Sequence, residues 1–199
     1  MSRASLLRAA TYACMPWKNG GGSTREITRD AGEGLAGFGW RLSIADIDES
    51  GDFSRFTGYQ RIITVLEGAG MALRVDGQPS RPLLAFDPFA FAGDSQVACT
   101  LLDGPIRDFN LIYAPQRYRA RLQWFDLRQP VRLFSSASTL LLFSAAEQLS
   151  VRLDDQAATL LQRHDCLQLE GNTRLLEVEL LATPPGRCCL IELDPQPQG

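Results

Sequence analysis

The chain has 199 residues, of which 45% are hydrophobic and 22% are charged, the composition of an ordinary globular protein rather than a disordered or fibrous one. Its formal net charge of −3 argues against a protein that coats nucleic acid or an anionic membrane. No apolar run approaches the roughly 18 residues that a membrane helix needs. Arg8 interrupts the apolar stretch near the N-terminus, so a signal peptide is not expected either. We therefore expect a cytoplasmic protein with no nucleic-acid partner and no membrane partner.

The histidine and cysteine content limits the metal and redox chemistry. The chain has one histidine, His164, and five cysteines, none of them in a C-x-x-C spacing. A zinc site needs closely spaced Cys and His ligands, and a catalytic site of several histidines cannot be built from one. We expect no metal, no cofactor, reduced and mostly buried cysteines, and a structural role for His164. A disulfide, a reactive thiol or a Ser-His-Asp triad remains an alternative.

Taken in chain order, the pattern is nearly all strand. Apolar and polar residues alternate over 38–45, the period-2 pattern of a strand, and a β-branched run covers 61–66. Residues 71–75 alternate up to an Asp-Gly pair, which predicts a hairpin turn, and 97–102 runs into another turn. A helix is the alternative for 116–127, but alternation of apolar residues with arginines favours a strand there. Short strands separated by Gly, Pro and Asp predict a sandwich or barrel.

The strand pattern repeats within the chain. A shift of 78 residues places Leu73-Arg74-Val75-Asp76 on Val151-Arg152-Leu153-Asp154 and Gly93 on Gly171. The apolar pattern and the turn positions agree as well, so we expect two similar β units that meet near residues 115–130. The expected boundaries are 1–115 for the first unit and 116–199 for the second.

The middle of the first unit resembles a cupin barrel. Val65-Leu66-Glu67-Gly68-Ala69-Gly70 precedes a strand and an Asp-Gly turn, as in the cupin fold. The resemblance implies an all-β bicupin, two jelly-roll β-sandwich (RmlC-like) units packed together. The usual cupin metal motif has two His and a Glu before this turn, whereas this chain has Gly58-Tyr59-Gln60-Arg61, so cupin metal chemistry is not expected.

Longer strings resemble the HutD/Ves family more closely. They are Met15-Pro16-Trp17-Lys18-Asn19-Gly20-Gly21-Gly22-Ser23-Thr24-Arg25-Glu26-Ile27, Trp40-Arg41-Leu42-Ser43-Ile44-Ala45-Asp46, Phe53-Ser54-Arg55-Phe56, Ile63-Thr64-Val65-Leu66-Glu67-Gly68 and 102–110. The match is dense in the first half of the chain and only a general β pattern in the second half. The resemblance implies a two-cupin protein associated with histidine-utilisation genes of bacteria.

The candidate site gathers in the first unit around a Gly-rich segment. Lys18 is the only lysine among twenty cations and precedes Gly20-Gly21-Gly22, which is either an anion-binding nest or a turn between strands. Thr24 and Glu26 share one face of the next strand, which is either an exposed edge strand or a barrel wall in which an inward Glu26 would need a cation such as Lys18 or Arg61.

Two arginines and a carboxylate–amide pair complete the candidate site. Arg61 heads an apolar strand face and needs a partner or a ligand, whereas Arg41 points either to solvent or into the barrel. Asp108 and Asn110 share a strand face and are suited to bind a nitrogen-bearing group or to pair with Arg61. The expected ligand-binding residues are Lys18, Asn19, Thr24, Glu26, Arg41, Arg61, Asp108 and Asn110, and the sequence identifies no catalytic residue.

The sequence supports three hypotheses for function. The first is a metal-free bicupin that binds a small anionic metabolite, an intermediate of histidine breakdown such as urocanate or a formylated or formiminated glutamate, as a sensor or governor of histidine utilisation. The second is a metal-independent isomerase, lyase or hydrolase with Glu26 or Asp108 as base and Lys18 as acid. The third is an interaction module in which the structural second unit supplies the face of a homodimer.

Overall fold

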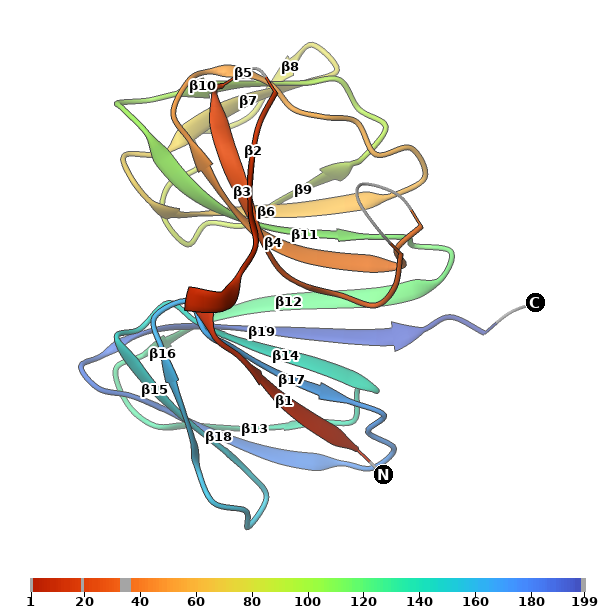
Figure 1. The fold of residues 1–199 in the computed structure, drawn as a ribbon, viewed down its shortest axis with the longest axis vertical. Coiled ribbons are helices and arrows are strands. Elements are labelled where there is room, and N and C mark those ends of the chain that lie inside the picture. Colours follow the sequence, from red (N-terminus) through yellow and green to blue (C-terminus); the bar gives the residue numbers. More distant parts are fainter. Residues whose placement is uncertain (1, 19, 33–36, 198–199) are drawn as a thin grey trace. The chain divides into compact units, whose positions relative to one another are not determined.

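The computed structural model describes residues 2–18, 20–32 and 37–197. In these ranges the chain forms strands and a single short 3-10 helix, η1 (Ala9–Thr11), which confirms the all-β prediction (Figure 1). None of the described residues forms a helix long and apolar enough to cross a membrane. The chain divides into two compact units, which we call the N-terminal unit (Tyr12–Gln116) and the C-terminal unit (the segment up to Thr11 together with the segment from Arg117 onward).

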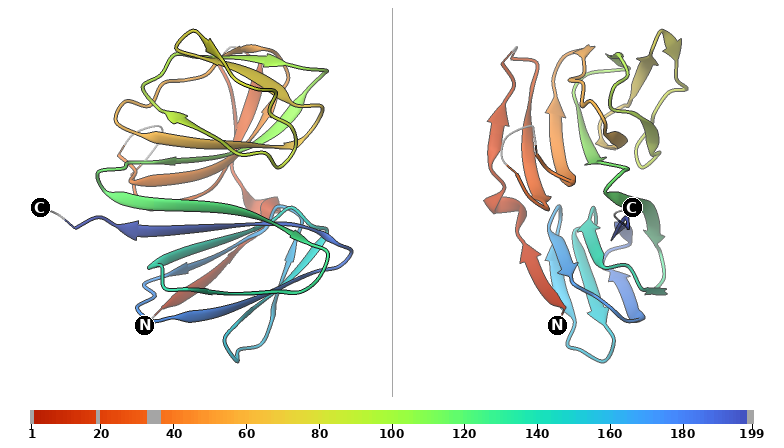
Figure 2. Two further views of the ribbon diagram at one scale, coloured as in Figure 1. Left: turned by 180° about the vertical axis from the view of Figure 1, so that it is seen from behind. Right: turned by 90° about the vertical axis from the view of Figure 1, so that its right-hand side faces the viewer.

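The N-terminal unit consists of a six-stranded and a four-stranded antiparallel sheet. The larger sheet has the order β2-β3-β4-β11-β6-β9 and the smaller β5-β10-β7-β8. Figure 2 shows the layers of strands from the side. The strands are β2 (Cys14–Pro16), β3 (Gly22–Arg29), β4 (Trp40–Ile47), β5 (Gly51–Asp52), β6 (Gln60–Glu67), β7 (Met71–Val75), β8 (Gln78–Pro79), β9 (Phe89–Ala92), β10 (Val97–Leu101) and β11 (Ile106–Tyr113).

The C-terminal unit is built in the same way from a five-stranded and a four-stranded sheet. Their orders are β1-β17-β14-β19-β12 and β13-β18-β15-β16. The strands are β1 (Arg3–Leu7), β12 (Tyr118–Leu127), β13 (Val131–Ser135), β14 (Thr139–Ser144), β15 (Gln148–Leu153), β16 (Thr159–Gln162), β17 (Cys166–Glu170), β18 (Leu176–Ala182) and β19 (Gly186–Pro195).

The internal repeat is visible in the sheet topology. The order β4-β11-β6-β9 in the N-terminal unit matches β12-β19-β14-β17 in the C-terminal unit, and β5-β10-β7-β8 matches β13-β18-β15-β16. Left-handed backbone conformations recur at the predicted shift of 78, at Asp76 and Asp154 (φ 48° in both) and at Phe86 and His164 (φ 62° and 68°). The segment 116–127 contains the strand β12 (Tyr118–Leu127), as the alternation predicts, and no helix.

The first strand differs from the expected division at residues 115 and 116. β1 pairs with β17 over its whole length, from Arg3 opposite Glu170 to Leu7 opposite Cys166, so it belongs to the C-terminal unit (Figure 1). Asp165 fixes the end of this segment, because its buried carboxylate accepts hydrogen bonds from Arg8 Nη1 (2.7 Å) and the Ala9 amide (2.8 Å). A short strand with no turn to its partner has no local sequence signal, which is why alternation alone could not place it.

Each unit has its own apolar core between its two sheets. In the N-terminal unit, Ile63 and Val65 of β6 pack in one cluster with Met71 and Leu73 of β7 and Val97 of β10. The corresponding core of the C-terminal unit is a larger cluster rich in leucine. Four of the five cysteines are buried and all five are free thiols, with Cys14 exposed.

Asp165 should be a large contributor to the stability of the C-terminal unit. Its carboxylate also accepts a hydrogen bond from the Gln162 amide (2.9 Å), so Asp165→Ala leaves two backbone donors and Arg8 without their partner. We expect a loss of about 2–4 kcal/mol in the free energy of unfolding, measured by chemical denaturation.

Asp87→Ala is the matched control, because Asp87 lies 78 residues earlier at the equivalent turn and pairs with Arg81, with side chains 36% and 52% exposed. It should cost less than about 1 kcal/mol. Equal losses for the two variants would contradict the role given to Asp165.

Candidate functional site

The N-terminal unit encloses a cavity of about 600 Å³, a volume typical of sites for small metabolites. It opens between the segment around β2, the strand β5 with the residues just after it, and the inner face of the six-stranded sheet. The lining residues are Met15, Pro16, Trp17, Lys18, Thr24, Arg41, Ser43, Ala45, Ile47, Asp52, Phe53, Ser54, Phe56, Arg61, Asp108, Asn110 and Ile112.

The register of four neighbouring strands brings the polar side chains together. Residues opposite each other in an antiparallel sheet point to the same face. Three rows therefore cross β3, β4, β11 and β6 on the inner face, and they are Arg29–Arg41–Ile112–Arg61, Glu26–Ser43–Asn110–Ile63 and Thr24–Ala45–Asp108–Val65. This answers the question that the sequence left open for Arg41, which lines the cavity on the face opposite Trp40 and Leu42.

Arg61 is buried with its charge surrounded by aromatic rings. The residue is only 5% exposed. Its guanidinium carbon lies 5.3 Å, 5.4 Å and 5.0 Å from the ring centres of Phe53, Phe56 and Phe91. Nη1 donates a hydrogen bond to the Ser54 carbonyl (3.1 Å), whereas Nε has no partner among the described residues. Burial lowers the pKa of Arg61 to about 10, against the opposing effect of Asp108, so the side chain stays charged at neutral pH.

Asp108 and Asn110 present unpaired acceptors to the cavity. Asp108 is 1% exposed, and the described residues supply no hydrogen-bond partner for its Oδ1 or for Oδ1 of Asn110. Burial raises the pKa of Asp108 to about 7, although the charge of Arg61 and a hydrogen bond from the Ala45 backbone oppose the rise. Buried acceptors without partners are costly, so both atoms favour a donor from a ligand or water.

Glu26 lies on the inner face with cations as partners, as the inward alternative requires, but it does not line the cavity, and its partners are Arg29 and Arg41 and not Lys18 or Arg61. Its carboxylate accepts hydrogen bonds from Arg41 Nε (2.6 Å) and from Arg29. Burial acts to raise the pKa of Glu26, but the hydrogen bonds and charges of Arg29 and Arg41 outweigh it and the pKa is lowered. The local cause is the register shift between Glu26 and Thr28, which brings Arg29 opposite Arg41.

The Gly-rich segment packs Trp17 against the sheet. A Cβ at Gly22 would lie 2.3 Å from the Asp46 carbonyl oxygen and 3.2 Å from the Trp17 ring, so only glycine fits there. The indole Nε1 donates to Thr24 Oγ1 (2.8 Å), and the Gly20 amide donates to the Trp17 carbonyl (3.1 Å). The Gly20 amide is therefore used within the turn, which favours the turn over an anion-binding nest at this position.

Of the eight predicted site residues, six line the cavity. Lys18 is exposed and lies in the lining, and Asn19 lies outside the described residues. The six that the structure brings together are Lys18, Thr24, Arg41, Arg61, Asp108 and Asn110.

The apolar half of the lining is not identified by the strand pattern of the sequence. Trp17, Phe53 and Phe56 line the cavity, and two of them surround Arg61. Trp17 and the string Phe53-Ser54-Arg55-Phe56 both belonged to the motifs that carried the family resemblance. That resemblance was the only signal for them, because nothing in the strand pattern indicates which ring meets Arg61.

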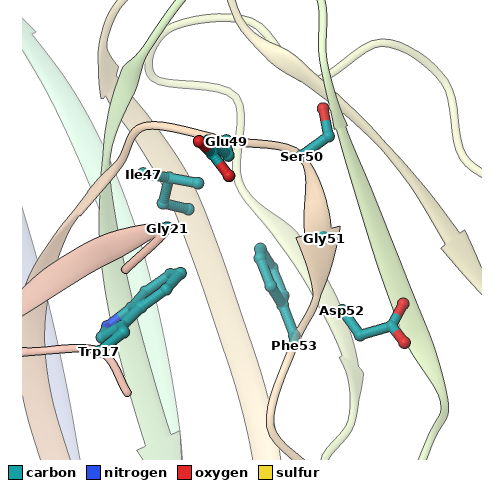
Figure 3. A pocket seen from close by; sticks show the side chains of 8 residues that line it. All are labelled: Trp17, Gly21, Ile47, Glu49, Ser50, Gly51, Asp52 and Phe53. Atoms are coloured by element: carbon teal, nitrogen blue, oxygen red, sulfur yellow. The ribbon is translucent and has the colours of Figure 1, made fainter. Parts of the chain in front are cut away.

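A second, much smaller hollow of about 30 Å³ adjoins the cavity and shares Trp17, Ile47, Asp52 and Phe53 with it. Figure 3 shows the rings of Trp17 and Phe53 pointing toward the hollow together with Ile47, whereas the side chain of Asp52 points away from Trp17. Its volume suits a single water molecule and not a metabolite.

The side chains of the cavity do not suit a divalent metal. Within the described ranges, no three His, Cys, Asp or Glu side chains cluster as a metal site would require. The buried polar lining combines one carboxylate, Asp108, with the positive charges of Arg41 and Arg61, which repel a cation. His164 belongs to the C-terminal unit, where its ring stacks on Phe143 with the centres 5.6 Å apart.

Three of the site positions are apolar in the C-terminal unit, whereas the position of Arg41 holds Arg121, which pairs with Glu192. Strand register pairs Arg61 with Ile112 and Val65 with Asp108, and it pairs Leu140 with Glu192 and Ser144 with Cys188. Leu140 therefore stands in place of Arg61, Cys188 in place of Asp108 and, by the same register, Leu190 in place of Asn110. All three belong to the core of that unit. The polar cluster is thus a property of the N-terminal unit.

Comparison with known proteins agrees with this organisation. The model of the HutD family matches residues 9–190. A protein of Pseudomonas putida described as an uncharacterized 21.2 kDa protein in the hutC 3' region is 67% identical over 97% of this chain and 98% of its own length. The solved structure of HutD from Pseudomonas fluorescens SBW25, titled as a formate condition, is 59% identical, with a TM-score of 0.86 over 98% of this chain and 100% of that one.

More distant relatives agree with the family and with the fold. Protein Ves of Citrobacter koseri is 38% identical over 69% of this chain and 71% of its own length. Solved structures of cupin-fold proteins match at 9–10% identity, which shows the fold alone.

The raised pKa of Asp108 predicts a pH-dependent cost to stability. With a pKa of about 7 in the folded protein against 3.8 for an ordinary Asp, the folded state binds more protons than the unfolded state between these values. Stability therefore falls as the pH rises through this window. Asp108→Asn removes this dependence, so the variant should gain on the wild type by about 3 kcal/mol between pH 4.5 and pH 8.

Urea denaturation at both pH values measures this gain. Asn110→Ser lies on the same face of β11 and adds no titrating group, so its difference from the wild type should be the same at both pH values. A gain for Asp108→Asn that does not change with pH would contradict the raised pKa.

Proposed function

The chain belongs to the HutD family, and we propose that it binds a small carboxylate-bearing metabolite in the cavity of its N-terminal unit. The observation that carries the proposal is the presence of two buried arginines in the lining of one cavity. Arg41 is 3% exposed and Arg61 is 5% exposed, and among the described residues that line the cavity Asp108 is the one buried carboxylate beside them. Excess positive charge in a dehydrated site favours an anion.

The anion-binding end is formed by Arg41, with Arg61 and Lys18 adding charge. Glu26 engages Nε of Arg41, while the two terminal nitrogens of Arg41 form no hydrogen bond with the described residues. A guanidinium edge with two free N–H groups matches the two oxygens of a carboxylate. Lys18 is exposed and contributes a mobile point charge to the cavity.

The opposite end of the ligand carries hydrogen-bond donors. Oδ1 of Asp108 and Oδ1 of Asn110 accept no hydrogen bond from the residues that the structure describes, and the two side chains lie two positions apart on one face of β11. An amide, amidine or imidazole N–H satisfies such acceptors. The aromatic rings of Trp17, Phe53 and Phe56 supply contact for the body of the ligand.

The family connects this chemistry with histidine utilisation. Intermediates of histidine breakdown such as urocanate and the formylated or formiminated glutamates combine a carboxylate with an N–H group, as the cavity requires. A protein that holds such an intermediate without turning it over acts as a sensor or governor of the pathway. The P. putida relative, described by its position in the hutC 3' region, supports this assignment.

Isothermal titration calorimetry against urocanate, N-formylglutamate and N-formiminoglutamate tests the proposal. We expect at least one of them to bind in the micromolar to millimolar range, and Arg41→Ala and Arg61→Ala each to weaken binding at least tenfold, the effect of losing a charge-assisted hydrogen bond. Arg25→Ala removes an arginine that pairs with Asp46 and does not line the cavity, so it should change affinity less than twofold. No binding of any of the three at millimolar concentration would contradict the proposal.

Catalysis by Asp108 is the second candidate function, favoured by one observation. A carboxyl with a pKa of about 7 in a cavity is suited to transfer a proton at neutral pH, with Lys18 as electrostatic stabiliser. Glu26 is not suited to act as the base, because its carboxylate is bound by Arg29 and Arg41 and its pKa is lowered.

Proton NMR of each compound with the purified protein should reveal a product if this candidate is correct. Asp108→Asn should then abolish turnover, and Lys18→Ala should reduce it. Binding of a compound with no product after prolonged incubation would exclude turnover of that compound.

A further inference from the structure

We infer that Glu26 is a positioning residue that orients Arg41 toward the carboxylate of the ligand, and that it does not contact the ligand itself. This inference rests on the proposed function of the cavity. It differs from a simple charge effect because a carboxylate near an anion site weakens anion binding by repulsion, whereas a carboxylate that orients the binding arginine strengthens it. The two effects have opposite signs, so removal of Glu26 distinguishes them.

The contact between Glu26 and Arg41 fixes one edge of the guanidinium. Nε of Arg41 donates to Oε2 of Glu26 at 2.6 Å, and Arg41 lies in the lining of the cavity whereas Glu26 does not. A planar guanidinium held at Nε cannot rotate freely about its last bonds, so its remaining edge keeps a fixed direction. That edge bears the terminal nitrogens, which have no hydrogen-bond partner among the described residues.

Arg29 holds the carboxylate of Glu26 in place. Arg29 donates to both carboxylate oxygens, with Nε at 2.5 Å from Oε1 and Nη2 on Oε2. The guanidinium carbon of Arg29 lies 5.8 Å from the ring centre of Phe38, a fully buried side chain. Phe38 is fixed in turn, because Tyr59 donates a hydrogen bond to its carbonyl (2.7 Å) and the two rings lie 4.6 Å apart. A support this rigid reduces the entropy that Arg41 loses when a carboxylate binds.

The state of charge of Glu26 suits this role. Its two arginine partners lower its pKa, so Glu26 remains ionised at neutral pH and continues to accept the hydrogen bond from Arg41. The pair of Glu26 and Arg29 is neutral as a whole, which leaves the full positive charge of Arg41 for an anion in the cavity.

The experiment measures the affinity of urocanate and N-formylglutamate for Glu26→Gln by calorimetry. Positioning predicts a loss of tenfold or more, and repulsion alone predicts a gain. Asp46→Asn is the matched control, because Asp46 also lies between two arginines of the same sheet, Arg25 (2.7 Å) and Arg107 (2.6 Å), but outside the cavity lining. It should change affinity less than twofold.

Glu26→Asp is the second variant, for use if Glu26→Gln does not fold, because it retains the negative charge. Shortening the side chain by one methylene moves the carboxylate away from Nε of Arg41 without changing the electrostatics of the cavity. A loss of affinity in this variant is therefore geometric in origin. Unchanged affinity in Glu26→Asp and Glu26→Gln would overturn the inference.

A double-mutant cycle shows whether Glu26 acts through Arg41. In an Arg41→Ala background, followed by NMR titration at millimolar ligand, Glu26→Gln should cause no further loss, whereas a general structural role would give an additive loss. The Nε–H resonance of Arg41 reports the contact without any ligand and should shift in Glu26→Gln.

The outcomes separate the inference from the proposed function. If the Nε–H resonance shifts but the affinity does not change, Glu26 holds Arg41 without assisting binding, and only the inference fails. If the wild type binds neither compound, the proposed function fails and the inference fails with it.

Discussion

Two arginine charges inside an apolar sandwich are the constraint on which the N-terminal unit depends. Removing a guanidinium from water is costly unless other groups replace the lost hydration. The chain replaces this hydration in two different ways. The carboxylate of Glu26 pairs with Arg41, whereas aromatic rings and the Ser54 carbonyl oxygen surround Arg61. The arrangement around Arg61 is incomplete, because Arg61 Nε lacks a partner within the described part of the chain, and so do Asp108 Oδ1 and Asn110 Oδ1. The interior of this unit thus combines an apolar core with buried polar groups that line a cavity.

The two repeated units show what happens when this constraint is absent. At the positions of Arg61, Asp108 and Asn110, the C-terminal unit has Leu140, Cys188 and Leu190, and these side chains join a continuous apolar core. The same topology therefore supports a cavity or a filled sandwich according to a few side chains on the inner sheet face. Such specialisation of one copy is consistent with a structural role for the other.

Alternation and the repeat predicted much of this from the sequence. Period-2 patterns placed the strands of both halves, and the shared face of Asp108 and Asn110 came directly from that period. Alternation could not place β1 in the C-terminal unit, because its pairing with β17 joins residues far apart in the chain. Alternation also gave no indication of the partners of Glu26. The register shift beside Glu26 brings Arg29 onto its carboxylate, and a bulge has no clear signal in the strand pattern. The rings around Arg61 come from loops and from β9, so only the tertiary fold brings them together.

The same charges couple the two ends of the cavity. Arg61 lowers the pKa of Asp108 and Asp108 raises that of Arg61, so each group depends on the ionisation of the other. A carboxylate bound beside Arg61 would compete with Asp108 for the charge of Arg61 and raise the pKa of Asp108 further. A protonated Asp108 is a hydrogen-bond donor as well as an acceptor. Binding of an anion beside the arginines therefore changes which groups Asp108 can bind. A ligand that carries both a carboxylate and a polar group at the right separation therefore meets a site whose two ends respond to each other, and a simple carboxylate meets only one of them.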